Sequence, residues 1–476
     1  MFVPEQVTTI FGHKSMSEAK KERVVPVRHP IYGMCVVLGV AVLILAIVEG
    51  VYYIQGSATV AAGWVLLLGL LAISVANYLI SWDILYPAFM FSAVWSLAAA
   101  VYDFFPFEID PISWTTVCIF LGGNLCFSLG CILGNRRWNN RPAWFTTRAE
   151  NTQPRRLLLL YSIIAVPLVV YHAMRATGVY SISPTFFIAL RQIVLARQSD
   201  FRNIFLDYAP TVSVSTAFIL LIEEHNRWLV AAGVVVTIVL GLLTTGRPIL
   251  LLLFIGWMML ALLRKPNRSI RAMAMRLTWM AVVIVLVLTL VTLLTKRETQ
   301  TENLDNKSGL EVAWGMTATY IAGPLAGFDY VVRRPESFEG YQNSTFAEII
   351  APLSALGFPV NLPPKDDPFL RVPFLINVFT AYKNYYIDFG MIGCFIAFSF
   401  FGFISSYLFR AATRGNQMAT FFSAYLFYAM LFTPFDDVYF ATFTRYIYVT
   451  AFGLAYFFVS RRFRLKLMIS RQGAQA

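Results

Sequence analysis

The sequence predicts an all-α polytopic membrane protein with about twelve transmembrane helices, both termini on the cytoplasmic side, and one long, partly helical outer loop. Three observations predict this fold class. Hydrophobic residues make up 58% of the 476 residues, whereas charged residues make up only 13%. Apolar runs of about 20 residues, the length that crosses a bilayer as a helix, recur along the chain. Lys and Arg gather in the short loops of one side, as the positive-inside rule expects.

The apolar runs divide the chain into two tails, a membrane domain and one large loop. The tails are residues 1–30 and 461–476. The first nine spans fall in 31–295, with an interfacial helix near 184–204 between two of them, and the last three fall in 384–460. The large loop is 296–383. The expected spans are 31–54, 59–80, 84–102, 112–134, 156–174, 205–222, 228–244, 248–263, 277–295, 384–409, 418–434 and 439–460.

The net charge of +12 follows from orientation in the membrane. Basic residues concentrate in short inner loops such as Arg136-Arg137 and Arg264-Lys265 and in the C-terminal tail. This placement matches the charge bias that orients membrane helices. We therefore expect the lipid bilayer, and no nucleic acid, as a partner.

The most informative break in the apolar pattern is Thr244-Thr245-Gly246-Arg247-Pro248. A charge between two membrane-length apolar runs is costly unless it lies at an interface or has a partner, which makes it a functional hypothesis. Pro248 suits the first position of a helix. Arg247 would then lie at a helix N-terminus, where free N–H groups and the helix dipole favour phosphate or another anion.

The segment before the sixth span predicts a basic amphipathic helix near 184–204. At helical spacing Arg191, Gln198 and Arg202 share one face, and the opposite face is apolar. Arg197 falls on the apolar side, so it snorkels or points at an anion. Two interpretations stay open: an anchor for lipid headgroups, or a contribution to substrate binding.

The loop 296–383 is far longer than a connection needs to be. Its stretch from Trp314 to Val332 could form an amphipathic or re-entrant helix, and the stretch from Pro352 to Pro373 is rich in proline. Many aromatic residues make the loop too apolar for a flexible linker. We expect it to pack over an outward-facing cavity, as a lid or a binding element.

The span after this loop begins with polar residues. Asn384 and Asp388 are four residues apart and so share one helical face. Asp388 lies about one turn inside the helix and needs a partner such as Arg247, Arg445 or a substrate hydroxyl. The glycines that follow, Gly390 and Gly393, permit close helix approach.

A second intramembrane arginine, Arg445, lies in the last span, just after Asp436 and Asp437. With Asp388 it could form a structural ion pair. Together with Arg247, however, these residues make a mixed-charge cluster at one depth, and such pairs are an inefficient source of stability. A functional site is the alternative interpretation.

Several chemistries lack their motifs. The chain has no Gly-x-x-x-x-Gly-Lys-Ser/Thr loop for nucleotide phosphates and no Gly-x-Ser-x-Gly elbow for a serine nucleophile. Its four histidines are scattered, and its outer carboxylates lack convincing metal spacing. We expect a site of arginines and one or two acids, with no metal and no cofactor.

The chain resembles the Wzy-type oligosaccharide repeat-unit polymerases, which make O-antigen and exopolysaccharide at the bacterial inner membrane. The resemblance rests on Thr245-Gly246-Arg247-Pro248, on the long outer loop, and on Thr380-x-x-Lys383-x-Tyr385-Tyr386-x-Asp388-Phe389-Gly390-x-x-Gly393. It covers roughly residues 200–450 and is carried by the order and topology of these features.

The resemblance implies transfer of a glycan from undecaprenyl pyrophosphate to another lipid-linked repeat unit at the periplasmic face. Arginines and a helix N-terminus would stabilise the pyrophosphate leaving group, and a carboxylate would act as general base. The catalytic candidates are Arg247, Asp388 and Arg445, with Asp329 as the alternative acid. The substrate-binding candidates are Arg191, Arg197, Arg202, Arg297, Tyr320, Lys383, Asn384 and Tyr386.

Three further expectations concern partners and alternatives. A chain-length-regulating co-polymerase is a possible protein partner. A ligase that transfers O-antigen to a lipid A core would share the donor and the arginines and differ in its acceptor. A flippase or transporter of lipid-linked glycans is the alternative without bond formation, although such proteins often show internal repeats, which this sequence lacks.

Overall fold

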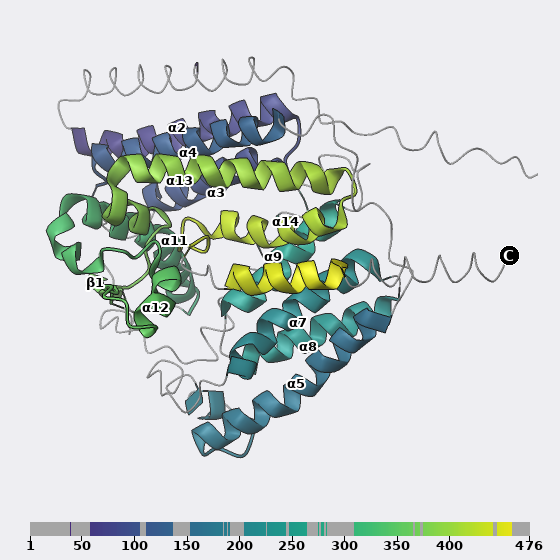
Figure 1. Ribbon diagram of the computed structural model, residues 1–476. Helices are drawn as coiled ribbons and strands as arrows, with labels where there is room; N and C mark the ends of the chain where they lie inside the picture. The colour runs from purple at the N-terminus through teal and green to yellow at the C-terminus, as the bar shows by residue number, and fades with distance from the viewer. Residues whose placement is uncertain are drawn as a thin grey trace, which may run out of the picture.

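The computed structural model describes residues 58–104, 111–136, 153–190 without 184 and 188, 204–263 without 225 and 244–246, 309–440 without 365–366 and 372–374, and 445–458, with isolated helical residues at 39, 275, 278–279 and 282. The described fold is all-α, apart from one pair of two-residue strands (Figure 1). The helices are α2 (Ala58–Ser81), α3 (Pro87–Asp103), α4 (Trp114–Arg136), α5 (Gln153–Thr177), α7 (Ile204–Glu223), α8 (Arg227–Leu243), α9 (Arg247–Leu263), α11 (Gly309–Arg333), η2 (Pro335–Tyr341), α12 (Ala347–Ala355), α13 (Tyr382–Thr413) and α14 (Gln417–Phe432), and a further helix covers 445–458.

The described helices have the composition of a membrane protein. Four of them contain stretches long and apolar enough to cross a bilayer: Ala62–Ser81, Trp114–Asn135, Pro154–Thr177 and Tyr382–Thr413. Shorter apolar helices accompany them at Tyr208–Glu223, Arg227–Leu243, Pro248–Leu263 and Gln417–Phe432. Many large apolar side chains of these helices face outward, as lipid-facing residues do.

The observed helices follow the predicted apolar runs within a few residues wherever the structure describes them. The helical character of the chain is thus confirmed. The count of twelve spans stays a prediction, because the runs at 31–54 and 277–295 lie largely outside the described residues. The position of the termini relative to a membrane also stays a prediction.

Helices α4 and α13 pack closely along one another, and glycines make this possible. A Cβ atom on Gly130 of α4 would overlap the Ser399 carbonyl oxygen of α13, and one on Gly402 would overlap the Phe127 carbonyl oxygen. Only a hydrogen atom fits at these points, so the backbones themselves are in contact. This pair forms the rigid wall from which the start of α13 projects.

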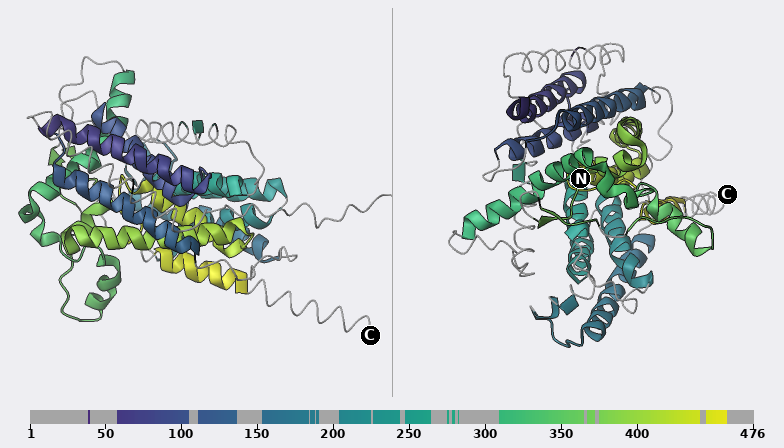
Figure 2. Two further views of the ribbon diagram at one scale, coloured as in Figure 1. Left: turned by 90° about the horizontal axis from the view of Figure 1, so that it is seen from above. Right: turned by 90° about the vertical axis from the view of Figure 1, so that its left-hand side faces the viewer.

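The helices run roughly along one direction, and α11, η2, α12 and the strand pair gather at one end, which we call the cap end (Figures 1 and 2). The start of α13 and the end of α14 meet there, since the Ala381 N–H donates to the Thr433 carbonyl at 2.9 Å. Helix α8 runs antiparallel to α7, because Ser213 of α7 contacts Thr237 of α8 and Ala217 of α7 contacts Gly233 of α8.

A buried ionic cluster marks the opposite end. Arg155 lies 3.9 Å from Glu223 and 3.5 Å from Glu224, and the Tyr456 hydroxyl donates to Glu223. These contacts join the start of α5, the end of α7 and the last helix. Since α7 ends here, α8 begins here and returns to the cap end, where α9 then starts.

The cap lies within the predicted loop 296–383 and is largely helical. Its α11 (Gly309–Arg333) covers the predicted helical stretch from Trp314 to Val332, so that prediction is confirmed. A short antiparallel pair, β1 (Leu370–Arg371) and β2 (Leu375–Ile376), precedes α13. The cap is tied to the helical body by Asp329, which accepts from the Ser113 N–H at 2.8 Å and pairs with Arg333 at 2.7 Å.

Candidate functional site

Helix α13 is broken close to its start by Gly390. This residue has φ 65° and ψ −161°, inside an otherwise helical segment. That backbone region is essentially restricted to glycine. A Cβ at Gly390 would meet no neighbouring atom, so the glycine serves backbone conformation and not the close helix approach expected from the sequence. The turns from Tyr382 to Phe389 therefore form a separate polar segment ahead of the long apolar helix.

A cluster of charged and polar side chains lies at the start of α13, and we call it the polar cluster. Three parts of the chain contribute to it: the first turn of α13, the loop after α14, and the cap segment before β1. Most of these side chains are buried or half-buried. Its members are Lys383, Asn384, Tyr385, Asp436, Asp437 and Asp367.

Asp437 is held in the polar cluster by several hydrogen bonds. Its Oδ1 accepts hydrogen bonds from the Tyr385 hydroxyl at 2.8 Å and from the backbone N–H groups of Tyr439 at 3.0 Å and Phe440 at 3.2 Å. The side chain of Asn384 lies against the same carboxylate. Asp437 is only 2% exposed, and burial raises its pKa although these donors oppose the shift. Its Oδ2 is buried and has no hydrogen-bond partner among the described residues.

The adjacent Asp436 has a different environment. Its Oδ1 accepts from the Asp437 N–H at 2.7 Å, and its side chain is exposed. The pKa of Asp436 is raised to about 7, mainly because the surrounding protein desolvates its carboxylate and also because the Asp437 carboxylate is close. Lys383 acts in the opposite direction and lowers this pKa.

Lys383 supplies the positive charge of the polar cluster. Its ammonium forms an ion pair with Asp367 and lies 4.9 Å from the centre of the Phe379 ring. The Lys383 side chain is 6% exposed, whereas that of Asp367 is 31% exposed. Asp436 is also within electrostatic range of Lys383. One buried ammonium thus stands between a carboxylate of the cap and a carboxylate of the helical body.

Asp388 lies one turn further along α13. Its Oδ2 accepts a hydrogen bond of 2.7 Å from the Thr345 backbone N–H, which precedes α12 (Ala347–Ala355) in the cap. This backbone donor is the partner that the sequence could not reveal. The other oxygen, Oδ1, is buried and has no hydrogen-bond partner in the described part of the chain.

Unpartnered acceptors concentrate around the polar segment of α13. Each buried polar atom without a partner costs about 1–3 kcal/mol, so a group of them indicates water or a ligand that donates hydrogen bonds. The side chains of Asn384 and Asp437 are 9% and 2% exposed, which leaves little room for bulk solvent. The atoms are Thr380 Oγ1, Asn384 Oδ1, Asp388 Oδ1 and Asp437 Oδ2.

The aromatic core beneath the site holds it in register. The Trp95 indole N–H donates to the Thr433 hydroxyl at 3.0 Å, and the Tyr382 ring stacks on Phe398 at 4.1 Å between centroids. Trp95 and Tyr382 also meet edge to face at 5.1 Å. Since Thr433 also accepts the Ala381 N–H, α3, α13 and the loop after α14 meet at one point.

Arg445 is the first described residue of the helix that covers 445–458, on its side toward the cap end. It lies within electrostatic range of the hydroxyls of Tyr425 and Tyr428 on α14, and Asp436 is within range of Tyr428 as well. Arg445 is half-buried. The structure therefore connects Arg445 to the polar cluster through Tyr428, and it gives no direct contact between Arg445 and Asp388.

Some of the remaining predicted site residues lie within the described ranges, and the others lie outside them. Helix α9 begins at Arg247, which confirms the predicted helix start before Pro248 and places this backbone at the cap end; the Arg247 side chain lies outside the description. Asp329 is buried and paired with Arg333, and Tyr320 is half-buried on α11. The ring centroids of Tyr386 and Phe328 lie 5.7 Å apart. Outside the described residues lie Arg191, Arg197, Arg202 and Arg297.

Asp367, Asp436 and Asp437 were not predicted as site residues. Nothing in the local sequence shows that Asp437 meets Tyr385, since the two are 52 positions apart. The adjacent pair of acids directly after an apolar span was the available signal. No group of three or more His, Cys, Asp or Glu side chains in the described ranges could hold a metal ion.

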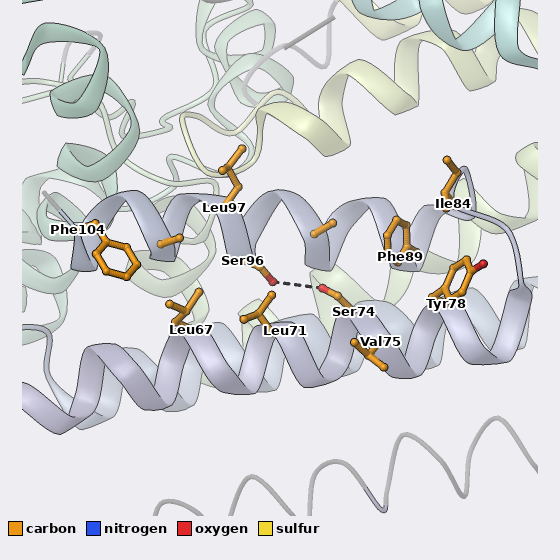
Figure 3. A pocket seen from close by; sticks show the side chains of 12 residues that line it. Leu67, Leu71, Ser74, Val75, Tyr78, Ile84, Phe89, Ser96, Leu97 and Phe104 are labelled. Carbon is orange, nitrogen blue, oxygen red and sulfur yellow. Dashed lines mark hydrogen bonds between the residues drawn. The ribbon is translucent and has the colours of Figure 1, made fainter. Parts of the chain in front are cut away.

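A separate apolar groove lies elsewhere in the described part of the chain. An apolar groove of about 720 Å³ runs between α2 and α3 (Figure 3). Its lining is almost entirely hydrocarbon, and its buried hydroxyls, Ser74 and Ser96, lie within hydrogen-bond distance of each other at 3.2 Å. The groove shares no residue with the polar cluster. It offers no group for acid–base chemistry.

The polar cluster combines groups for a polar reaction at one end of an apolar helical body. It holds a buried cation for an anion, unpartnered acceptors for hydroxyl donors, and an exposed carboxylate with a pKa near neutrality. Such carboxylates suit general acid–base catalysis. No protein-family model, no curated protein and no solved structure matches this chain.

Proposed function

We propose that the protein is a membrane glycosyltransferase that polymerises oligosaccharide repeat units linked to undecaprenyl pyrophosphate. In this proposal it acts at the periplasmic face of the bacterial inner membrane. The observation that carries the proposal is the group of unpartnered acceptors beside a buried ammonium at the start of α13. Sugar hydroxyls donate to such acceptors, and a pyrophosphate pairs with such a cation.

The proposed roles follow from position. Lys383 and the arginines at the cap end, Arg247 and Arg445, bind the pyrophosphate, whose charge grows as the glycosidic bond breaks. Asn384 and Asp388 bind hydroxyls of the acceptor sugar. The lipid-linked donor supplies the activation, which fits a chain without a nucleotide-binding motif. The aromatic residues of the cap cover the sugars.

Polymerisation can be tested with purified protein in lipid vesicles. The substrate is the lipid-linked repeat unit extracted from a strain in which the gene for this chain is deleted. Wild-type protein should convert it into a ladder of longer glycans, and Lys383→Met and Asp388→Asn should reduce the ladder strongly. Glu336→Gln is the control, because it removes an exposed carboxylate of the cap that is not a member of the polar cluster. A wild-type protein that forms no ladder would refute the proposal.

A second function is favoured by the break at Gly390. Interrupted helices with polar ends line the substrate sites of many transporters, so a flippase for the same lipid-linked glycan is the alternative. Vesicles separate the possibilities. Movement of the substrate between leaflets without new bonds indicates a flippase, and product formed only after lipid A core is added indicates a ligase.

A further inference from the structure

The carboxylates near the polar segment of α13 differ in what they can reach. Asp437 is enclosed, and its Oδ1 is already held by three donors. Asp367 is engaged by Lys383, whereas Asp388 and Asp436 each accept one backbone N–H, from Thr345 and from Asp437. Asp436 is the exposed carboxylate among these four. An incoming hydroxyl group can therefore approach Asp436 without breaking an ion pair.

Several described elements place charged or titratable groups within electrostatic range of Asp436. The charged and titratable ones are Asp437 in its own loop, Lys383 on α13, Asp367 in the cap and Tyr428 on α14. Beside them, the buried Asn384 Oδ1 and Asp437 Oδ2 have no hydrogen-bond partner among the residues that the structure describes. A sugar that donates hydroxyl hydrogens to these two atoms would be held next to the Asp436 carboxylate.

We propose that Asp436 accepts the proton of the acceptor hydroxyl in the glycosyl transfer and that Asp437, held by Tyr385, positions the acceptor; this inference rests on the function proposed above. The hydroxyl O–H bond breaks and its proton passes to a carboxylate oxygen of Asp436. The hydroxyl oxygen forms the new bond to the anomeric carbon of the donor. The bond from that carbon to the pyrophosphate oxygen breaks, and its electron pair leaves with the pyrophosphate. Asp436 then releases the proton to water.

The acidity of Asp436 suits this role. A general base works best when its pKa lies near the working pH, and burial together with Asp437 raises the pKa of Asp436 to about 7. The base must be unprotonated, so the rate should rise with pH and level off above about pH 7. Tyr385 stabilises the charged form of Asp437, and Asp437 in turn raises the pKa of its neighbour.

The test is the pH dependence of polymerisation from about pH 5 to about pH 9, measured with the extracted lipid-linked repeat unit. We expect Asp436→Asn to lower kcat by about 10²–10⁴-fold and to abolish the inflection near neutrality. Asp436→Glu should retain part of the rate and an inflection. Tyr385→Phe should lower kcat less than Asp436→Asn does and should move the inflection to lower pH, because Asp437 then carries less negative charge. Glu336→Gln should match the wild type.

The outcomes separate the two proposals. If the wild-type protein makes a ladder and Asp436→Asn keeps both the rate and the inflection, Asp436 is not the proton acceptor although the polymerase function stands. If the wild-type protein makes no ladder, the function itself fails. Binding of the lipid-linked substrate to Asp436→Asn, measured in the same vesicles, distinguishes loss of chemistry from loss of fold. Should that variant not fold, an Asp436→Glu enzyme whose rate coincides with that of the wild type at every pH would overturn the inference.

Discussion

The Tyr385 hydroxyl donates a 2.8 Å hydrogen bond to Asp437, which joins the first turn of α13 to the loop after α14. The two groups are 1% and 2% exposed. Asp437 also accepts two backbone N–H groups, so the bond to Tyr385 is the side-chain part of a mainly local network. The geometry of the polar cluster depends on this contact between two distant parts of the chain.

Removing that hydroxyl should weaken the protein measurably. In Tyr385→Phe the Asp437 carboxylate loses a charge-assisted bond, and we expect a loss of about 1.5–3 kcal/mol in the free energy of unfolding. Thermal unfolding in detergent micelles measures the change. Tyr180→Phe serves as control, since Tyr180 is 75% exposed. An unchanged unfolding temperature in Tyr385→Phe would show that the bond adds nothing to stability.

Gly390→Ala should disturb the polar segment more than its small size suggests. The backbone at Gly390 has φ 65°, which a residue with a Cβ adopts at a cost of about 1–3 kcal/mol. The segment then shifts relative to the long helix, and we expect activity to fall with stability. Gly340→Ala is a matched control, because its Cβ would also meet no atom and its backbone is not in the positive-φ region. Equal behaviour of both variants would contradict the proposed strain.

The ion pair of Lys383 with Asp367 should couple the cap to α13. Lys383→Met leaves the Asp367 carboxylate without its cation, and Asp367→Asn leaves a buried ammonium that still lies within electrostatic range of Asp436. A double-mutant cycle on unfolding should give a coupling energy of about 0.5–3 kcal/mol. Additive effects of the two substitutions would mean that the pair is not formed in the membrane.

Stability should depend on pH through Asp436. Its pKa in the folded protein, about 7, is above the ordinary value of 3.8, so folding favours the protonated form. The associated stability is complete below about pH 4 and is lost as the pH rises through about 7. Asp436→Asn lacks this loss, so its unfolding temperature should overtake that of the wild type at alkaline pH. Parallel pH curves for the two proteins would contradict the raised pKa; Glu336→Gln should follow the wild type.

The helices could be predicted from the sequence because apolar run length and punctuation are local signals. The start of α9 at Arg247 followed from the proline after it, and α11 followed from the apolar stretch between Trp314 and Val332. These features depend on neighbouring residues alone. The pattern of neighbouring residues was therefore sufficient to predict these two helices.

The site was harder to predict because its contacts are tertiary. Asp388 was expected to meet Arg247, Arg445 or a substrate hydroxyl; the partner that the structure gives it is a backbone N–H, and a backbone donor leaves no trace in residue identity. Gly390 was assigned to helix packing, whereas its dihedral angles show a break. Asp437 gains its importance from Tyr385, which only the fold brings near. The role of Arg247 stays a prediction.

The break at Gly390 has a mechanical consequence. A spanning helix tilts when bilayer thickness changes, and a continuous α13 would carry that tilt directly into its first turn. The interrupted backbone uncouples the two parts, while the Ala381–Thr433 and Tyr385–Asp437 bonds hold the first turn to the loop after α14. We therefore expect the polar segment to keep its alignment with Asp436 and Asp437 when the long helix tilts, so that changes in bilayer thickness affect the polar cluster little.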